Sequence, residues 1–293
     1  MRKNIFELYR ENDTISNDIN RLYRVFTKEE CLHYSIYDYT IPEYVDEYVF
    51  KNWKQKGNCL TVEDFLNVID FYEIYNNAKY ELEDLATFIE VLFNFWYLAN
   101  ERLCSSTSNK WSGNFYVFRD IMEDVLCKNN LKAYIDKTNE RVLIVEDKPE
   151  VSAVVEIVDE TLALDIVKYN HVSLQGEIEL KKSILRSLGA ELEAKRKELE
   201  TINKQLSNDI FFMLNNMNIR HNNRSKKAQS KYKEYVAKMT KKQLEKWYDE
   251  LYQMILLAFL LLDNVDRAKK VKELKNKVVG GNTNGQAQNA DGE

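Results

Sequence analysis

The spacing of apolar residues along this 293-residue chain is mostly helical. Pro42 suits the first turn of a helix, because its missing N–H would be unsatisfied there in any case. Thr61 followed by Asp64 is a relative of the capping box and predicts the start of a second helix. Only two prolines occur, so few residues interrupt helices in the body of the chain. The pattern predicts N-terminal helices over residues 42–57, 61–72, 82–103 and 115–127.

The period changes at residues 131–147, "LKAYIDKTNERVLIVED", where apolar and polar residues alternate. Together with the turn sequence "KTNE", this alternation predicts a β-hairpin, which needs a further element to pack against. The polar stretch "CSSTSNKWSGN" before it, at 104–114, is typical of a loop.

Pro149 marks the expected domain boundary, and helical patterns continue beyond it. Residues 150–171 predict a helix, although their β-branched residues leave a strand open as the alternative for the first half. Residues 174–206 predict one or two long amphipathic helices with Gly189 as the break. A short apolar helix over 207–216 has Ser207 or Asn208 as its cap. Thr240 and Gln243 form a capping box before the most regular helix, whose expected core positions are Leu244, Trp247, Tyr248, Leu251, Met254, Ile255 and Leu262.

The sequence therefore predicts a mainly α fold with two domains. Residues 1–148 form a helical region with a small β-hairpin, which could act as a sensor or regulatory part. Residues 149–278 form an antiparallel helical bundle. Residues 279–293 are expected to be a disordered tail, because the sequence from 280 onward contains no large apolar residue.

Composition narrows the functional classes. The cysteines, at positions 31, 59, 104 and 127, include no CxxC pair, so neither a zinc site nor a compact disulfide framework is expected. We expect no cofactor, because no P-loop, GxGxxG or GxSxG motif is present. The N-terminus lacks the apolar core of a signal peptide, and the longest apolar run, 255–262, is too short to span a bilayer. A cytoplasmic protein is expected.

The net charge of −5 is unevenly distributed. Residues 219–246 carry ten Lys or Arg against two Glu, a local +8 that leaves −13 for the remainder. This stretch predicts contact with RNA, because tyrosines interleaved with lysines offer flat faces on which unpaired bases stack. The alternative is an ordinary solvated surface. The candidate RNA-binding residues are Arg224, Lys226, Lys227, Lys231, Tyr232 and Lys233.

The segment "LNNMNIRHNN", residues 214–223, combines five asparagines with Arg220 and His221. An arginine can hold a phosphate, and a histidine exchanges protons near neutral pH. The combination therefore suits a catalytic site. The alternative is a purely structural loop, in which the asparagines end a helix and turn the chain.

Three stretches of the second half resemble the C-terminal domain of bacterial abortive-infection proteins, which act in anti-phage defence and belong to the HEPN superfamily. They are "YNHVSLQGEIELKKSILRSLGAELEAKRKEL", "FFMLNNMNIRHNN" and "KWYDELYQMILLAFLLLD", and the resemblance covers roughly 150–275. It implies a HEPN-like bundle that forms a homodimer and, in active members, cleaves RNA without a metal. A partner protein from the same defence system is a further implication.

The resemblance implies catalytic roles for Arg220 and His221, with Asn216, Asn222 and Asn223 positioning the substrate. The chain departs from the HEPN motif at 225–227, where Ser, Lys and Lys stand in place of the expected second histidine. His221 itself or His171 would have to replace it. Two hypotheses follow: a metal-independent endoribonuclease of antiviral defence, or a non-catalytic RNA- or protein-binding module that acts as a dimerisation or interaction component.

Overall fold

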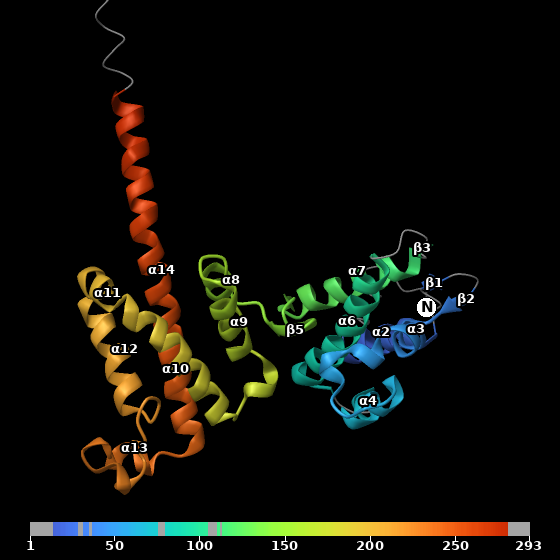
Figure 1. Cartoon of the computed structure of the whole chain (residues 1–293), viewed down its shortest axis with the longest axis horizontal. Helices are drawn as coiled ribbons and strands as arrows, with labels where there is room; N and C mark the ends of the chain where they lie inside the picture. Colours follow the sequence, from blue (N-terminus) through green and yellow to red (C-terminus); the bar gives the residue numbers. More distant parts are fainter. Residues whose placement is uncertain are drawn as a thin grey trace, which may run out of the picture. The chain divides into compact units, whose positions relative to one another are not determined.

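The computed structural model confirms a mainly helical chain (Figure 1). It divides into two compact units: unit 1 comprises 1–147 and 170–175, and unit 2 comprises 148–169 and 176–293. The structure describes residues 14–28, 32–34, 37–75, 80–104, 110–111 and 113–280.

Unit 1 is built around α6 (Leu82–Cys104), which contacts helices on several sides and supplies much of an aromatic core. Phe88 of α6 stacks on Phe71 with ring centroids 4.7 Å apart, and Phe95 packs against Phe26. Such ring pairs add stabilisation beyond the apolar area that they bury. The surrounding helices are α2 (Ile15–Lys28), α3 (Ile41–Tyr48), α4 (Val62–Val68), α5 (Phe71–Tyr75) and α7 (Gly113–Lys128).

The helix expected over 42–57 is shorter than predicted. Thr40 and Glu43 form a capping box at the start of α3, but the helix ends at Tyr48 and two 3-10 turns follow, Phe50–Asn52 and Lys54–Lys56. Trp53 between them has an extended backbone and a buried side chain. Burial of this ring in the core thus outweighs continuation of the helix.

The helix expected over 61–72 is also divided. The capping box of Thr61 and Asp64 is present at the start of α4, as predicted. Asp70 has a positive φ of 55° and separates α4 from α5. A left-handed residue cannot continue a right-handed helix, so the chain turns there.

Unit 1 contains two small β-structures. The predicted hairpin is confirmed: β4 (Leu131–Asp136) pairs antiparallel with β5 (Arg141–Glu146), with Asp136 opposite Arg141 at the turn. A second sheet, in the order β2-β1-β3, was not predicted. Its strands are β1 (Leu32–Tyr34), β2 (Tyr37–Tyr39) and β3 (Lys110–Trp111), which are too short to show an alternating pattern, and β3 lies in the expected loop.

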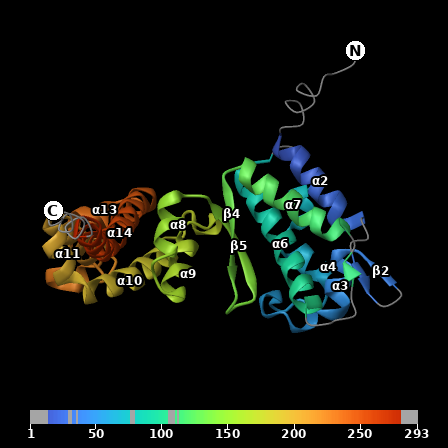
Figure 2. The same ribbon diagram turned by 90° about the horizontal axis from the view of Figure 1, so that it is seen from above.

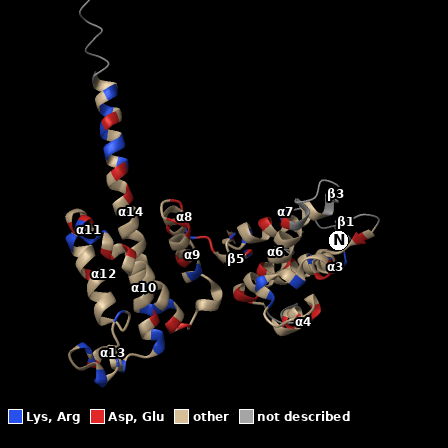
Figure 3. Cartoon of the chain, viewed as in Figure 1, with Lys and Arg blue, Asp and Glu red and all other residues tan. Residues whose placement is uncertain are grey.

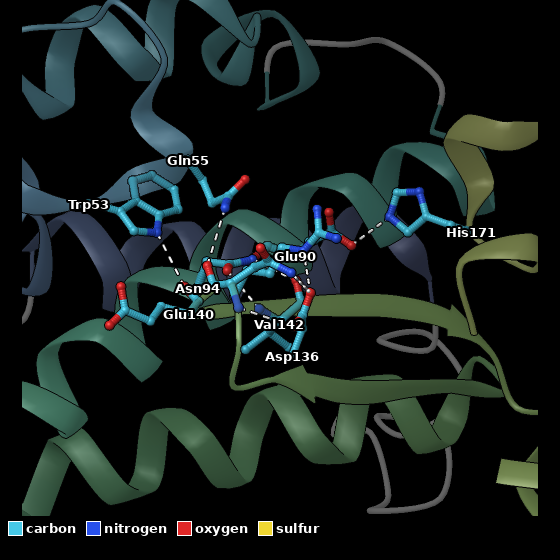
Figure 4. Close-up of polar contacts among 10 residues, drawn as sticks. Trp53, Gln55, Glu90, Asn94, Asp136, Glu140, Val142 and His171 are labelled. Atoms are coloured by element: carbon cyan, nitrogen blue, oxygen red, sulfur yellow. Dashed lines mark hydrogen bonds and ion pairs between the residues drawn. The ribbon is translucent and has the colours of Figure 1, made fainter. Parts of the chain in front are cut away.

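The hairpin lies along α6 (Figure 2). Side chains of α6 form hydrogen bonds with the edge of β5, where a third strand would otherwise pair. Val142 of β5 donates its N–H to the Asn94 Oδ1 and accepts from the Asn94 Nδ2, both at 2.8 Å. Figure 4 shows Asn94 beside Val142. Ile144 donates to the Glu90 Oε2 at 2.7 Å. Four residues of helix rise about 6 Å and two residues of strand about 6.7 Å, so the two spacings match. The outer edge of β5 is thereby hydrogen-bonded along Val142 and Ile144.

Unit 2 is a helical bundle around α14 (Lys241–Gly280), which packs against most of the other helices of the unit. The connection after α12 returns the chain so that α12 and α14 run in opposite directions (Figure 1). The capping box of Thr240 and Gln243 is present, as predicted. The other helices of the unit are α8 (Pro149–Val155), α9 (Glu160–Tyr169), α10 (Ile178–Ala194), α11 (Arg196–Ile202), α12 (Lys204–Asn216) and α13 (Glu234–Lys238).

Several expected boundaries in unit 2 are corrected. The helical interpretation of 150–171 is right and the strand alternative is wrong, since α8 and α9 occupy it. Gly189 lies inside α10, and the long segment is interrupted at Lys195 and Asn203 instead. Asn203, not Ser207 or Asn208, caps α12 by accepting from the Leu206 N–H at 3.0 Å.

The expectation of disorder is wrong for the first two residues of the range 279–293. Residues 279 and 280 are the last residues of α14, and the rest of the tail lies outside the described residues. Within the described part of the chain, none of the helices combines the length and apolar character needed to cross a membrane.

A buried lysine joins α10 to α14. The Lys181 Nζ lies 2.9 Å from the Glu245 Oε1 and 2.8 Å from the Asp249 Oδ1, and it sits 5.2 Å from the centre of the Tyr169 ring. Burial alone would raise the pKa of Glu245, but hydrogen bonds from Lys181 and from the Gly176 N–H outweigh it and hold that pKa below its ordinary value of 4.5. The charge of the buried lysine is thus neutralised locally.

We expect Lys181→Met to lower the free energy of unfolding by about 1–3 kcal/mol at pH 7, because charge-assisted hydrogen bonds are lost. A carboxylate with a lowered pKa stabilises the fold above its ordinary pKa, and this contribution disappears as the pH falls through the folded-state pKa. The difference between wild type and variant should therefore shrink below about pH 4.5. Urea unfolding at a series of pH values measures it, and a difference independent of pH would contradict the role of Glu245.

Candidate nucleic-acid interface

The polar segment expected to form the site lies where α12 ends. Met217 is the C-cap of α12, and the next residue, Asn218, has a positive φ of 63°. Asparagine tolerates this left-handed geometry, so the chain turns there and enters the long connection to α14. The connection contains a 3-10 segment, η4 (Lys226–Lys231), and the short α13.

Arg220 is held against α10. Its Nη1 forms an ion pair with the Glu193 Oε2 at 2.6 Å, and its Nη2 donates to the Gly189 carbonyl at 2.9 Å. The guanidinium also lies 5.5 Å from the centre of the Phe211 ring. The side chain is 21% exposed. These contacts fix the packing of the connection on α10, and a carboxylate occupies the position where a substrate phosphate would bind.

His221 lies beside Arg220 in sequence but does not bond to it. Its ring is half-buried and has no hydrogen bond within the described part of the chain, and its carbonyl accepts from the Asn223 N–H. His171, the alternative histidine, belongs to unit 1. The His171 Nε2 lies 2.7 Å from the Glu90 Oε2, and the Nδ1 lies 2.7 Å from the Ser173 Oγ, so neither nitrogen is available to a substrate without losing a contact.

The three asparagines expected to position substrate have different environments. Asn223 is fully buried: its Oδ1 accepts from the Asn218 N–H at 2.8 Å and its Nδ2 donates to the Lys231 carbonyl at 2.6 Å. Asn216 donates to the Phe212 carbonyl at 2.9 Å within α12. Asn222 is exposed and has no side-chain hydrogen bond within the described residues. The structure therefore gives Asn223 a clear role in stabilising the connection.

The candidate RNA-binding residues also divide between inward and outward positions. Arg224 donates to the Met239 carbonyl at 2.9 Å and helps to close the connection, and Tyr232 is half-buried. The lysines at 226, 227, 231 and 233 are all exposed. Lysines at 238, 241, 242 and 246 continue the exposed set into α13 and the first turns of α14 (Figure 3).

Three exposed aromatic side chains accompany these lysines: Tyr235, one of the tyrosines interleaved with them in the sequence, and Phe212 and Trp247, which were not among the candidate residues. Phe212 is 62% exposed, Tyr235 is 76% exposed and Trp247 is 44% exposed. All three line one pocket of about 370 Å³, together with Met213, Met217 and Lys233. We call this pocket, together with Lys233 and the exposed lysines of the same stretch of chain, the aromatic–lysine surface. Phe211 and Phe212 are adjacent in a helix, so their side chains point in different directions, and only Phe211 is buried. Two neighbouring aromatic residues in a predicted helix therefore indicate that one of them lies off the apolar face.

Trp247 corrects one further expectation. Its place in the helical pattern of α14 predicted a core residue, but nearly half of its surface is exposed at the pocket. Its neighbour Tyr248 is fully buried instead. Position 247 lies at the margin of the apolar face, where the period of 3.6 does not decide between core and surface.

The described residues contain no group of three or more His, Cys, Asp or Glu side chains arranged to hold a metal ion. Cys59 and Cys127 are free thiols, whereas Cys31 and the side chain of Cys104 lie outside the described residues.

Comparison with known proteins does not assign a family. No family model, curated protein or solved structure matches the chain. The HEPN resemblance, and the homodimer and defence role that it implies, therefore stay predictions.

Proposed function

We propose that unit 2 is a binding module for single-stranded RNA and that the aromatic–lysine surface is its binding site. One observation carries the proposal: Phe212, Tyr235 and Trp247 expose their rings around a single pocket that Lys233 also lines. Exposed apolar surface bordered by charged residues is typical of a binding site.

The chemistry of the surface suits unpaired nucleotides. Aromatic rings stack on any base, because every base has a flat π-face, and lysines attract the phosphates that connect the bases. The pocket would receive a base, and Lys233 at its edge would lie beside the adjoining phosphate. A double helix hides the faces of its bases, so single strands should bind more tightly than duplexes.

Replacing Trp247 with alanine is expected to weaken the binding of a single-stranded RNA by about 5- to 150-fold, the range that follows from losing one stacked base. Fluorescence anisotropy with a labelled oligonucleotide in EDTA measures the dissociation constant. Log affinity should also fall linearly with log salt, with a slope of about −3 if about four phosphates are contacted.

Tyr116→Ala is the matched control, since it removes a similarly exposed aromatic side chain from α7 of unit 1. Its affinity for RNA should equal that of the wild type. Equal losses in Trp247→Ala and Tyr116→Ala, or the absence of any salt-sensitive binding by the wild type, would contradict the proposed surface.

Metal-independent RNA cleavage is the second candidate, and one observation favours it: the His221 ring is half-buried and has no hydrogen bond within the described residues. A cleaving site would require the Arg220 guanidinium to exchange the Glu193 carboxylate for a phosphate. The same incubations test this candidate, because products with 2′,3′-cyclic phosphate ends that disappear in His221→Ala would establish it. Intact RNA would leave binding as the activity of the module.

A further inference from the structure

Unit 1 contains another pocket, which shares no residue with the aromatic–lysine surface. Its volume is about 640 Å³, within the range of small-molecule sites. The walls come from the end of α3, the turn that holds Asn52 and Trp53, the C-terminal half of α6 and the end of the β4–β5 hairpin. We call it the hairpin pocket.

The walls of the hairpin pocket are held in place by hydrogen bonds. The Trp53 Nε1 donates to the Glu140 carbonyl at 3.3 Å, and the Gln55 Nε2 donates to the Asn139 carbonyl at 3.2 Å (Figure 4). Within the turn, the Asp136 carboxylate accepts from Arg141 and from Asn139. The pocket therefore exists before a ligand arrives, which limits the entropy lost on binding.

Tyr97 marks the polar part of the pocket. The residue is only 8% exposed and lines the pocket, and its hydroxyl has no hydrogen-bond partner within the described residues. The hydroxyl oxygen is not sealed from solvent, so it can bond to a water or to a ligand that enters the pocket. Burial, and after it the charges of Glu101, Glu140 and Asp136, raise the pKa of Tyr97. The hydroxyl thus stays neutral and lies in a negative potential.

Two carboxylates are available to a ligand there. Glu101 lines the pocket without an ion pair or hydrogen bond among the described residues, and Glu140 has only a loose ion pair with Lys54 at 3.9 Å. Asp136 is already satisfied by Arg141 and Asn139. Lys137 also lines the pocket, but it is exposed. The charges near Tyr97 therefore favour a cation over an anion.

We propose that the hairpin pocket binds a small organic cation. An ammonium group between Glu101 and Glu140 donates a hydrogen bond to the Tyr97 hydroxyl. The carbon skeleton of the ligand packs on apolar residues of the walls. One of them is Ile135, whose side chain is half exposed. The aromatic rings of Tyr48 and Trp53 also line the pocket, and ring faces attract cations.

Isothermal titration calorimetry with the full chain tests the proposal, with putrescine and spermidine as cations and citrate as an anion. We expect saturable binding of at least one cation with a dissociation constant below about 1 mM. The variant Glu101→Gln with Glu140→Gln should bind that cation at least about tenfold more weakly, because charge-assisted hydrogen bonds are lost. Tyr97→Phe should weaken it as well, with an unchanged circular dichroism spectrum.

A second double variant is the control for nonspecific attraction of cations to an acidic protein. Glu250→Gln with Glu273→Gln removes the same two charges from exposed positions of α14 in unit 2 and should leave the affinity unchanged. Failure of both cations to saturate, tighter binding of citrate, or equal losses in the two double variants would overturn the proposal. None of these outcomes depends on RNA binding by unit 2.

Discussion

Asn223→Ala is expected to lower the free energy of unfolding by about 2–5 kcal/mol, one of the largest effects of a single substitution in this chain. The side chain is fully buried and joins the start of the connection, at the Asn218 N–H, to its middle, at the Lys231 carbonyl. Alanine leaves both backbone groups without their partner. Each such group costs about 1–3 kcal/mol when it stays buried.

The same substitution should weaken RNA binding. The Asn223 carbonyl accepts from the Lys233 N–H at 2.8 Å, and Lys233 lines the pocket of the aromatic–lysine surface. Loosening the backbone at Asn223 should therefore displace Lys233. Urea unfolding followed by circular dichroism measures the stability, and anisotropy below the unfolding transition measures the affinity.

Asn222→Ala is the control for Asn223→Ala. The two residues are adjacent and chemically identical, but Asn222 is exposed and makes no side-chain hydrogen bond within the described residues. Its replacement should change stability by no more than about 0.5 kcal/mol. Equal destabilisation by the two substitutions would show that the connection does not fold as described.

In unit 1, Asn94→Ala is expected to cost about 2–4 kcal/mol. The amide of Asn94 satisfies both backbone groups of Val142, and it also donates to the Glu90 carbonyl at 2.7 Å. Without this amide, the N–H and the carbonyl of Val142 have no partner in a buried, apolar environment. The hairpin should detach from α6 more easily, which hydrogen exchange at Val142 and Ile144 would detect as faster exchange.

Asn67→Ala provides the comparison, because Asn67 is an exposed asparagine of α4. We expect it to change stability by less than about 0.5 kcal/mol and to leave exchange at β5 unaltered. An Asn94 variant as stable as the wild type would mean that hydrogen bonds from α6 do not stabilise the edge of β5.

Local signals predicted most of the helices. The capping boxes of Thr61 and Thr240 each depend on residues three positions apart, so the sequence shows them directly. The first described helix, α2, was not predicted, although its buried residues Ile19, Leu22 and Phe26 follow helical spacing. That signal was available in the sequence.

Other features depend on contacts between distant parts of the chain. A Cβ on Gly189 would lie 2.8 Å from the Leu214 side chain, so this glycine allows α10 and α12 to approach closely and does not break a helix. Asn94 and Val142 are 48 residues apart. Neither role is visible in a local pattern, because each is defined by the partner that the fold supplies.

In the candidate site, too, some features follow from the local sequence and others depend on tertiary contacts. The sequence indicated a polar turn after α12 and a basic stretch behind it, and the structure has both. It could not indicate that Arg220 faces Glu193, or that Asn223 is buried while Asn222 is exposed. The exposure of Phe212 and Trp247 also depends on tertiary packing, since apolar residues on helices are usually core.

Ultraviolet crosslinking of a single-stranded RNA to the full chain, followed by mass spectrometry of the crosslinked peptides, tests the central claim most directly. The RNA should crosslink to peptides that contain Phe212, Tyr235 or Trp247, because stacked bases lie against these rings. Crosslinks confined to unit 1, or none above the level obtained with the same RNA as a duplex, would contradict an RNA-binding surface in unit 2.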